Sequence, residues 1–375
     1  MKILFISLMQ GFPWGGSEDL WYRTARLAIA QNHSVLVSVK QWDTLPNKIE
    51  ELENLGATIH LRQTHKPIGL WGRVKNKIKG YRNKFPSPYA ALESFNPGVV
   101  VVSQGNTFSF ASDSHLRELL YSKRYIIISQ WNSEFGILPI QYRESAINLI
   151  KNARAFVFVS YRNLHVAQRQ IAYRIENSTV IYNPVNLSKK EYIAYPTVVS
   201  QVQFACVARL DCDYKGQDLL FEALSADNWK ERSWRLNLYG TGPDLNYLKE
   251  LALYFGIADK IIFAGHVACI EDIWKKNHIL LLPSHSEGSS LSLMEAMMCG
   301  RCAVVTDVGA NTELINNTRG FVAAAPTVSC IGRALDEAWN HRHEWEALGL
   351  NAYNFVKSQL KENSEELLMK MILNP

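Results

Sequence analysis

The sequence predicts an α/β protein with two Rossmann-like, doubly wound domains that face a central cleft. Three observations support this fold class. Short β-rich runs alternate with amphipathic helical stretches, which is the pattern of parallel sheets covered by helices. This series occurs twice, once in each half of the chain. The chain has 375 residues, of which 47% are hydrophobic, so it is long enough for two or three domains and too apolar for a disordered protein.

In the first half, short β-rich runs predict the strands of one parallel sheet. They are Lys2–Leu8, Ser34–Val39, Thr58–Leu61, Val99–Ser103, Tyr125–Ser129, Ala155–Ser160 and Thr179–Tyr182. The first run resembles a signal peptide, but it is brief and a Gly-Gly turn follows, which favours a strand. Helical spacing of apolar residues predicts a helix over Ser17–Gln31.

In the second half, the same pattern predicts a second sheet. Its strands are Gln203–Ala208, Arg235–Tyr239, Lys260–Ala264, His278–Pro283, Cys302–Thr306 and Gly320–Ala323. Helices are predicted between and after them, over Gln217–Leu224, Leu245–Phe255, Ser290–Met298 and Val328–Trp339. The alternation of strand and helix indicates parallel strands joined by helical crossovers.

The predicted domain boundary lies where a strand runs into Pro184 and two asparagines, at residues 182–186. We therefore predict one domain over residues 1–186 and a second over residues 187–350. Residues 351–375 are predicted to be mostly helix, which would pack back on the first domain.

The charges are distributed unevenly along the chain. Residues 1–187 carry 22 Lys and Arg against 12 Asp and Glu, a net charge of +10, whereas residues 188–375 carry 18 against 23, a net charge of −5. The densest basic cluster, residues 73–84, follows Leu70 and Trp71. No nucleic-acid-binding motif accompanies it, so we expect a solvated helix face or contact with an anionic membrane rather than nucleic acid. No apolar run is long enough to span a bilayer.

All six cysteines lie in the second half, and Cys299 and Cys302 have the C-x-x-C spacing of redox and zinc sites. No second pair of ligands with the right spacing accompanies them. We expect reduced, structural thiols in a cytoplasmic protein.

Several motifs follow predicted strands, at the edge where open α/β sheets bind ligands. After the first strand, Gly15 and Gly16 precede Ser17, which is predicted to start a helix. A helix start favours a bound anion. The glycine spacing differs from that of the dinucleotide-binding fingerprint. In the second half, Arg209 follows a strand and Lys215 precedes a helix. Two cations there could hold a diphosphate, although surface Arg and Lys are most often only solvated.

A second set of motifs lies on the following strands. The turns Gly240–Pro243 and Gly265–Val267 bring backbone to the same edge. Glu287 and Glu295 flank the start of a predicted helix, where free N–H groups favour an anion and carboxylates can accept hydrogen bonds from sugar hydroxyls. Glutamates near a helix start are also common without any ligand.

Together these motifs resemble the family-4 glycosyltransferases, which are retaining enzymes of GT-B architecture. The resemblance covers most of the chain and is most specific over residues 203–323. It rests on residues 15–18, 183–185, 209, 215–216, 240–243, 287–295, 306–310 and 313.

The resemblance implies transfer of a sugar from a nucleotide-sugar donor to a glycan or lipid-linked acceptor, with retention of anomeric configuration, as in envelope polysaccharide synthesis. Arg209 and Lys215 would stabilise the diphosphate leaving group, and Glu287 would contact the transferred sugar. The residues expected at the donor are Gly16, Gly242, His266, Val267, Gly288, Ser290, Leu291 and Glu295, the last on the ribose. No metal or other cofactor is expected.

The acceptor side departs from the family pattern. Many relatives carry a His or Asp after a late strand of the first domain, whereas residues 129–134 here contain no His. We expect Gln104, Asn132 and Glu134 on the acceptor side. A non-catalytic sugar-nucleotide-binding protein and a nucleotide-sugar epimerase on the same architecture are the alternatives. The enzyme would be cytoplasmic, peripheral to the inner face of the membrane.

Overall fold

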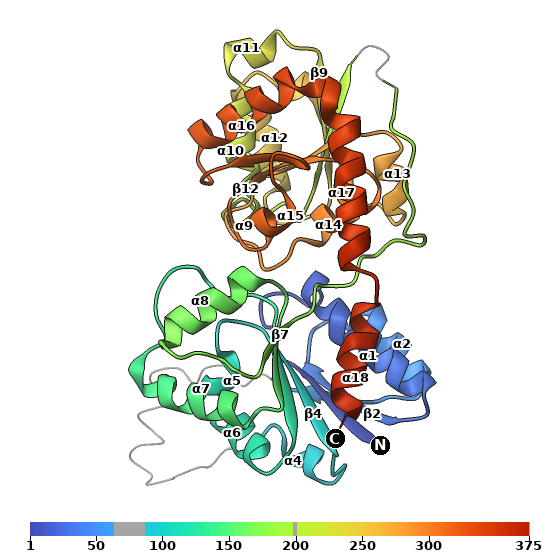
Figure 1. Cartoon of the computed structure of the whole chain (residues 1–375), viewed down its shortest axis with the longest axis vertical. Coiled ribbons are helices and arrows are strands. Elements are labelled where there is room, and N and C mark those ends of the chain that lie inside the picture. Colours follow the sequence, from blue (N-terminus) through green and yellow to red (C-terminus); the bar gives the residue numbers. More distant parts are fainter. Residues whose placement is uncertain (64–86, 198–200, 375) are drawn as a thin grey trace. The chain divides into compact units, whose positions relative to one another are not determined.

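The structure, a computed structural model, describes residues 1–63, 87–197 and 201–374. It divides the chain into two compact units (Figure 1). The first unit consists of Met1–Val159, Asn163–Asn183 and Ser364–Pro375, and the second of Ser160–Arg162 and Pro184–Asn363. The main division, between Asn183 and Pro184, falls inside the segment 182–186 in which the sequence predicts the hinge.

The first unit is built on a parallel sheet whose seven described strands lie in the order β3-β2-β1-β4-β5-β6-β7. The strands are β1 (Lys2–Ser7), β2 (Ser34–Lys40), β3 (Thr58–Arg62), β4 (Val99–Gln104), β5 (Tyr125–Ser129), β6 (Ala155–Phe158) and β7 (Ser178–Val180). Successive residues of a strand point to opposite faces. Accordingly, Ile3 and Phe5 of β1 pack into one apolar cluster, and Leu4 and Ile6 pack into another.

Helices cover both faces of this sheet (Figure 1), which makes the unit doubly wound. The helices described in this unit are η1 (Gly16–Glu18, a 3-10 turn), α1 (Asp19–Ala30), α2 (Asn47–Asn54), α4 (Ala90–Glu93), α5 (Ser109–Ser112), α6 (Ser114–Tyr121), α7 (Ile140–Asn152), α8 (Tyr161–Ile171) and α18 (Ser364–Leu373). The long predicted helix over Ser17–Gln31 is thus a short 3-10 turn that continues into α1.

The predicted C-terminal helix is two helices. Residues 345–359 form α17 (Trp345–Gln359) in the second unit, and α18 belongs to the first. The polar segment 361–363 separates them, because its side chains have no apolar face to continue the packing of α17. In α18, Leu368, Met369 and Ile372 are buried in the same cluster as Leu20 and Trp21 of α1.

The second unit has a parallel sheet whose six described strands lie in the order β10-β9-β8-β11-β12-β13. They are β8 (Val202–Val207), β9 (Trp234–Tyr239), β10 (Ile261–Gly265), β11 (Ile279–Leu282), β12 (Ala303–Thr306) and β13 (Gly320–Ala323). On one face, Phe204 of β8 stacks on Trp234 of β9 with ring centroids 6.0 Å apart, and Trp229 packs edge-on against both rings.

Short helices connect these strands, and two longer ones follow. They are α9 (Cys212–Lys215), α10 (Gln217–Leu224), α11 (Asp227–Lys230), α12 (Leu245–Tyr254), η2 (Ala258–Lys260), α13 (Ile270–Trp274), α14 (Leu291–Met298), α15 (Asn311–Leu314), α16 (Val328–Asn340), η3 (Arg342–Glu344) and α17. Each of the thirteen predicted strands overlaps a strand of the structure to within two residues at each end, which confirms the predicted α/β fold class.

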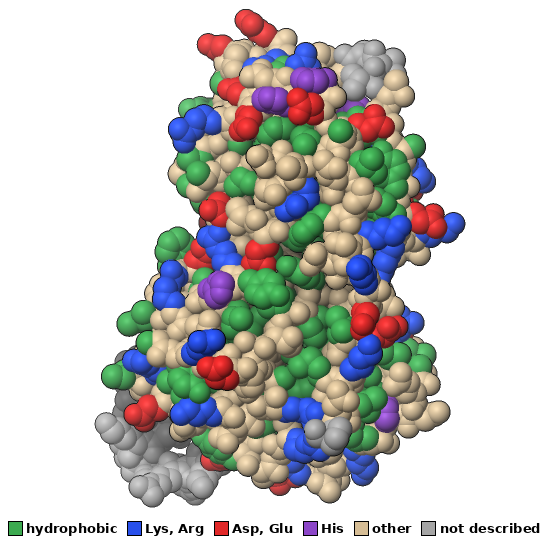
Figure 2. All heavy atoms as spheres, viewed as in Figure 1, with side chains coloured by type: hydrophobic (Ala, Val, Ile, Leu, Met, Phe, Trp, Pro, Cys, Tyr) green, Lys and Arg blue, Asp and Glu red, His purple; other side chains and the backbone are tan. Residues whose placement is uncertain are grey.

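On the face drawn in Figure 2, basic and acidic side chains are interspersed over the described surface. The basic segment 73–84, with Leu70 and Trp71, lies outside the described residues. Within the described ranges, no helix combines the length and apolarity needed to cross a membrane.

Candidate functional site

The second sheet reverses its strand order between β8 and β11. From β8 the chain passes to β9 on one side, while β11 lies on the other side of β8. In open α/β sheets, ligands bind at such a switch point, outside the carboxyl ends of the strands. Arg209 and Glu287 lie in the loops that follow β8 and β11, and Lys215 ends the short helix α9 after β8, so the three predicted catalytic residues lie at this edge.

Lys215 and Glu287 form an ion pair across the switch point. The Lys215 Nζ atom lies 2.6 Å from Glu287 Oε1, and Ser284 Oγ donates a second hydrogen bond of 2.7 Å to the same oxygen. The Glu287 side chain is 8% exposed and that of Lys215 is 23% exposed. A partly buried pair of this kind is more strongly coupled than a surface pair, because solvent screens it less. Glu287 therefore holds the ammonium in place at the sheet edge.

Arg209 is held by different partners. Its guanidinium forms an ion pair with Asp211 and lies over the ring of Tyr214, 6.0 Å from the ring centroid. The Arg209 backbone carbonyl accepts a 2.8 Å hydrogen bond from Gln217 Nε2, which is fully buried at the start of α10. Both cations thus lie beside a carboxylate, and an arriving anion would compete with that carboxylate for them.

The turn after β9 packs tightly against the loop after β8. Leu210 N donates to Thr241 O over 3.0 Å, and Asp244 N donates to Leu210 O over 3.1 Å. A Cβ atom at Gly242 would lie 2.1 Å from Leu210 O, so only glycine allows the two backbones to meet this closely. Gly242 therefore supports the position of Arg209.

The loop after β11 ends at the start of α14. Ser290 caps this helix, with its side-chain oxygen accepting a hydrogen bond from Leu293 N, and Leu291 is the first helical residue. Gly288 O accepts from Ala310 N over 3.0 Å, which ties the loop to the one after β12. The helix has eight residues. Its start favours an anion, because the first N–H groups of a helix have no partner within the helix.

Glu295, the predicted ribose contact, lies on the buried face of α14 and is 4% exposed. Its Oε1 accepts a 3.0 Å hydrogen bond from Asn186 N in the segment that follows the division between the units. His266 and Val267 follow β10, which is separated from β8 by β9, so they follow a strand that does not border the switch point. His266 is exposed and Val267 is half-buried.

Asp211 and Asp213 have an Asp-x-Asp spacing, which is compatible with metal binding. The prediction of a metal-free site did not take this spacing into account. Asp211 is paired with Arg209. Among the described residues, no group of three or more His, Cys, Asp or Glu is placed to hold a metal ion.

In the first unit, the switch point lies between β1 and β4. Gln104 ends β4, and its Nε2 donates to Asn132 Oδ1 over 3.1 Å in the loop after β5. The structure thus brings these two predicted acceptor-side residues together. Glu134 lies further along the loop, where its backbone carbonyl accepts from Arg169. Gly16 begins the turn η1, at the end of the loop that follows β1.

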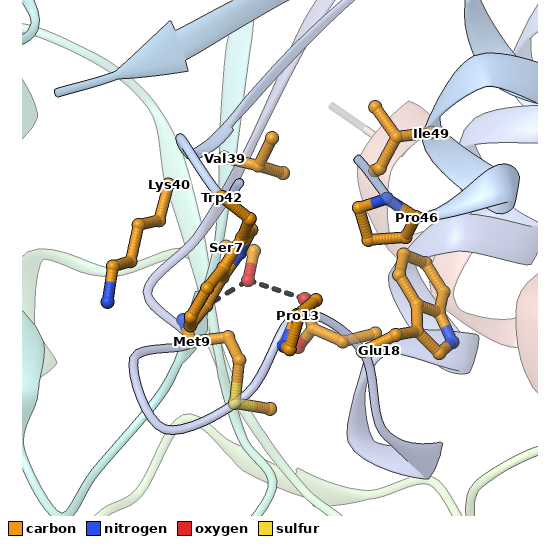
Figure 3. Close-up of a pocket in the computed structure, with 10 residues that line it drawn as sticks. Ser7, Met9, Pro13, Glu18, Val39, Lys40, Trp42, Pro46 and Ile49 are labelled. Atoms are coloured by element: carbon orange, nitrogen blue, oxygen red, sulfur yellow. Dashed lines mark hydrogen bonds between the residues drawn. The ribbon is translucent and has the colours of Figure 1, made fainter. Parts of the chain in front are cut away.

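A small hollow that is partly open to solvent lies near the ends of β1 and β2 (Figure 3). Its lining includes Ser7, Glu18, Trp14 and Trp42. Ser7 Oγ donates a 2.5 Å hydrogen bond to Glu18 Oε2 and accepts one from Met9 N, as the dashed lines in Figure 3 show. Burial raises the pKa of Glu18 from 4.5 to about 7, an effect that the Ser7 hydrogen bond opposes.

Part of the chain that contains this edge is similar to a known family. Residues 201–341 match the sequence model described as glycosyl transferases group 1. The matched residues lie within the second unit and are similar to the group 1 glycosyltransferases. The matched range contains both cations and both glutamates of the switch-point edge.

A curated relative matches part of the chain. Over 119 residues the chain is 34% identical to the lipopolysaccharide core biosynthesis mannosyltransferase LpsB of Rhizobium meliloti, a match that covers 30% of this chain and 34% of LpsB. The chain therefore spans about a third of the length of this curated relative.

Two solved structures match nearly the whole chain. A glycosyltransferase from Rickettsia africae superposes with a TM-score of 0.75 at 15% identity, covering 100% of this chain and 99% of its own. HepE from Anabaena, in complex with UDP and glucose, superposes with a TM-score of 0.71 at 16% identity and full coverage of both chains. At this identity the likeness establishes the fold, which is the GT-B fold of two Rossmann-like units.

Three side chains at these sites were not among the predicted site residues. Asp211 and Ser284 position Arg209 and Glu287, and Glu18 lies in the hollow of the first unit. Asp211 is two residues from Arg209, and Ser284 is three from Glu287, a spacing that could have indicated both. Glu18 stands next to Gly16 and Ser17 in the sequence, but nothing there indicates its burial.

Proposed function

We propose that the chain transfers a sugar from a nucleotide-sugar donor, bound by the second unit, to a hydroxyl of a glycan or lipid-linked acceptor, bound by the first unit. The observation that carries the proposal is the pair of cations, Arg209 and Lys215, at the switch point of a sheet within the matched family range. In the reaction, the bond between the anomeric carbon and the diphosphate oxygen breaks, and the electron pair leaves with the diphosphate. The acceptor oxygen bonds to the anomeric carbon and gives its proton to the leaving diphosphate.

The residues of the second unit have distinct roles in this proposal. Arg209 and Lys215 stabilise the negative charge that develops on the leaving diphosphate, and the start of α14 adds N–H donors. Glu287 orients Lys215 and accepts hydrogen bonds from the transferred sugar, while Glu295 binds the ribose. Retention of configuration is part of the proposal, and the anomeric coupling constant of the product in NMR tests it directly.

A thermal-shift screen with UDP, GDP, ADP and their sugars tests the donor. Binding to the native state raises the melting temperature with ligand concentration. GDP-mannose is the first donor to try, because LpsB is named a mannosyltransferase, and UDP-glucose is the second, because HepE was solved with UDP and glucose. Donor consumption then separates transfer from the alternatives, since an epimerase would yield a new nucleotide sugar and a binding protein would yield none.

We further propose that the enzyme acts in the cytoplasm at the inner face of the membrane and contacts anionic lipid through residues 73–84. The six Lys and Arg of this segment support the proposal, because each basic residue near an anionic surface contributes about 1 kcal/mol. Neighbouring Leu70 and Trp71 would add apolar contact at the interface.

A further inference from the structure

The segment that leads from the division between the units toward β8 is fastened to the second unit at several points. This outgoing segment, residues 184–197, belongs to the second unit and runs beside α13 (Figure 1). It forms neither helix nor strand. Its position therefore depends on hydrogen bonds from its backbone and side chains to other parts of the unit.

The far end of the outgoing segment is held by Arg301, whose side chain is fully buried. Its guanidinium donates to Ile193 O over 3.0 Å and to Ala194 O over 2.9 Å. It also donates to Cys299 O and Gly300 O, directly after α14, over 2.8 Å and 3.2 Å. Because the guanidinium is a planar fork of donors in fixed directions, it joins the outgoing segment to the carboxyl end of α14 in one arrangement.

The middle of the outgoing segment is held by Glu271 of α13. Its Oε1 accepts from Ser188 N over 2.7 Å and from Ser188 Oγ over 2.6 Å. Burial opposes ionisation of this carboxyl group, but the hydrogen bonds from Ser188 lower the pKa of Glu271 to about 2. The carboxylate is therefore charged at neutral pH, and hydrogen bonds to a charged acceptor are stronger than neutral ones.

The near end of the outgoing segment meets Glu295 of α14. Asn186 N donates to Glu295 Oε1 over 3.0 Å, and Glu295 is 4% exposed. A carboxyl group this buried needs hydrogen-bond donors, and the Asn186 N–H is one of them. Both partners are also held independently of this bond, since Arg301 fixes the end of α14 and Ser188 fixes the chain two residues beyond Asn186.

A fixed N–H donor affects how a carboxylate receives a diol. The two carboxylate oxygens have about four acceptor positions, so accepting one N–H is compatible with accepting ribose hydroxyls. A donor that is itself fixed selects one orientation of the carboxylate. This lowers the entropy that is lost when a ligand binds to it. The bond from Asn186 should therefore favour a vicinal diol on Glu295.

We propose that the backbone N–H of Asn186 is a positioning group for the ribose of the nucleotide-sugar donor and acts through the carboxylate of Glu295. The inference deepens the proposed function and rests on it in one respect, namely that Glu295 contacts the ribose. Coupling of this kind is reciprocal. A ribose bound to Glu295 therefore strengthens the hold of the carboxylate on the Asn186 N–H.

Calorimetry on the full-length chain tests the proposal with GDP, UDP and their 2′,3′-dideoxy forms, which lack both ribose hydroxyls. Asn186→Pro removes the N–H, because proline has none, and Asn186→Ala is the matched control that keeps it. We expect Asn186→Pro to weaken ribonucleotide binding about ten-fold, the equivalent of one hydrogen bond, and to leave binding of the dideoxy form unchanged. Asn186→Ala should bind both forms like the wild type.

Three results would overturn the inference. The first is an equal loss of affinity for both forms in Asn186→Pro, which would indicate a purely structural role. The second is an equal loss in Asn186→Ala, which would assign the effect to the side chain. The third is equal affinity of the wild type for the two forms, which would mean that no ribose hydroxyl is recognised.

A second measurement uses the wild type alone and does not depend on the folding of the proline variant. Saturating ribonucleotide should slow backbone hydrogen exchange in peptides covering residues 184–192, whereas the dideoxy form at equal occupancy should not. Equal exchange with both forms overturns the inference. The two proposals fail in different ways: nucleotide binding without this dependence on the hydroxyls overturns only the positioning role, whereas absence of nucleotide binding overturns the donor assignment and the positioning role with it.

Discussion

Lys215 Nζ lies 2.6 Å from Glu287 Oε1, although 72 positions separate the two residues in the sequence. The pair joins the loops on either side of the switch point of the second sheet. It couples the residue proposed to stabilise the leaving group to the residue proposed to contact the sugar, so a change in either should affect the other.

Lys215→Ala should lower kcat at least 100-fold, because a charge-assisted contact to the leaving group contributes a few kcal/mol at the transition state. It should also destabilise the fold by about 1–2 kcal/mol, since it leaves the Glu287 carboxylate without its cation. Arg209→Ala should lower kcat similarly. Lys275→Ala is the matched control, because Lys275 forms an exposed ion pair with Asp272 at 2.7 Å. Steady-state kinetics on folded variants decide the matter, and wild-type kcat in both variants would refute the assignment.

Glu287→Gln should reduce kcat more than Glu295→Gln does. The first variant removes the charge that orients Lys215, next to the reacting centre. The second keeps an oxygen for Asn186 N and changes only a contact with the ribose, so it should mainly raise KM for the donor. Loss of kcat in Glu295→Gln with normal kcat in Glu287→Gln would require the two roles to be exchanged.

Gly242→Ala should weaken nucleotide binding and lower the free energy of unfolding by about 1–3 kcal/mol, because its Cβ would lie 2.1 Å from Leu210 O and force two loops apart. Gly332→Ala is the control within the same unit. Gly332 lies in α16, where a Cβ meets no atom within 4 Å, so this change should stabilise the protein by up to about 1 kcal/mol. Chemical denaturation and GDP thermal shifts measure both. A Gly242→Ala protein as stable as wild type would contradict the close packing.

The stability of the protein should fall as the pH rises from about 4.5 to about 7, through the titration of Glu18. Burial raises its pKa to about 7, with Asp19 adding to the rise and Arg62 opposing it. Between the two pKa values the folded state binds the proton and the unfolded state has lost it. Proton binding by Glu18 therefore contributes at most about 3 kcal/mol to the free energy of unfolding. This contribution is complete below pH 4.5 and is lost above pH 7.

Chemical denaturation at pH 5 and pH 8 measures this change, with Glu18→Gln as the comparison. The amide cannot ionise, so the difference between the two pH values should shrink in the variant. An identical difference in both proteins would assign the pH dependence to other groups.

The segment 73–84 should bind anionic vesicles and release them as salt increases, because screening weakens charge attraction at the surface. Sedimentation with anionic and with neutral vesicles at several salt concentrations measures this. Replacing the six Lys and Arg by Gln should abolish binding. Equal pelleting with both vesicle types, or no binding at low salt, would rule out electrostatic attachment.

The sheets were predictable from the sequence because buried parallel strands are short apolar runs that end at polar or glycine-containing loops. The run of β4 from Val99 to Val102 and the glycines that follow β9 are examples. The same logic placed Arg209, Lys215 and Glu287 at one sheet edge. It could not predict that Lys215 and Glu287 form an ion pair, because side-chain direction depends on loop packing between distant segments. The bond from Asn183 to Gln130, across 53 positions, was hidden for the same reason.

The C-terminal helix was predicted less well. Apolar residues continue at helical spacing through residues 351–373, so periodicity alone suggests one helix. Only tertiary packing distinguishes α17, which is buried in the second unit, from α18, which is buried against α1.

Because α18 completes the apolar cluster around α1, the first unit is assembled from segments at opposite ends of the polypeptide. During synthesis on a ribosome, residues 1–183 emerge with the α1 face that receives Leu368, Met369 and Ile372 still uncovered. The entire second unit has to be translated before that face can close. The nascent chain therefore holds an exposed apolar surface for the time taken to translate about 180 residues, which at about 5–20 residues per second is tens of seconds at the slower rates.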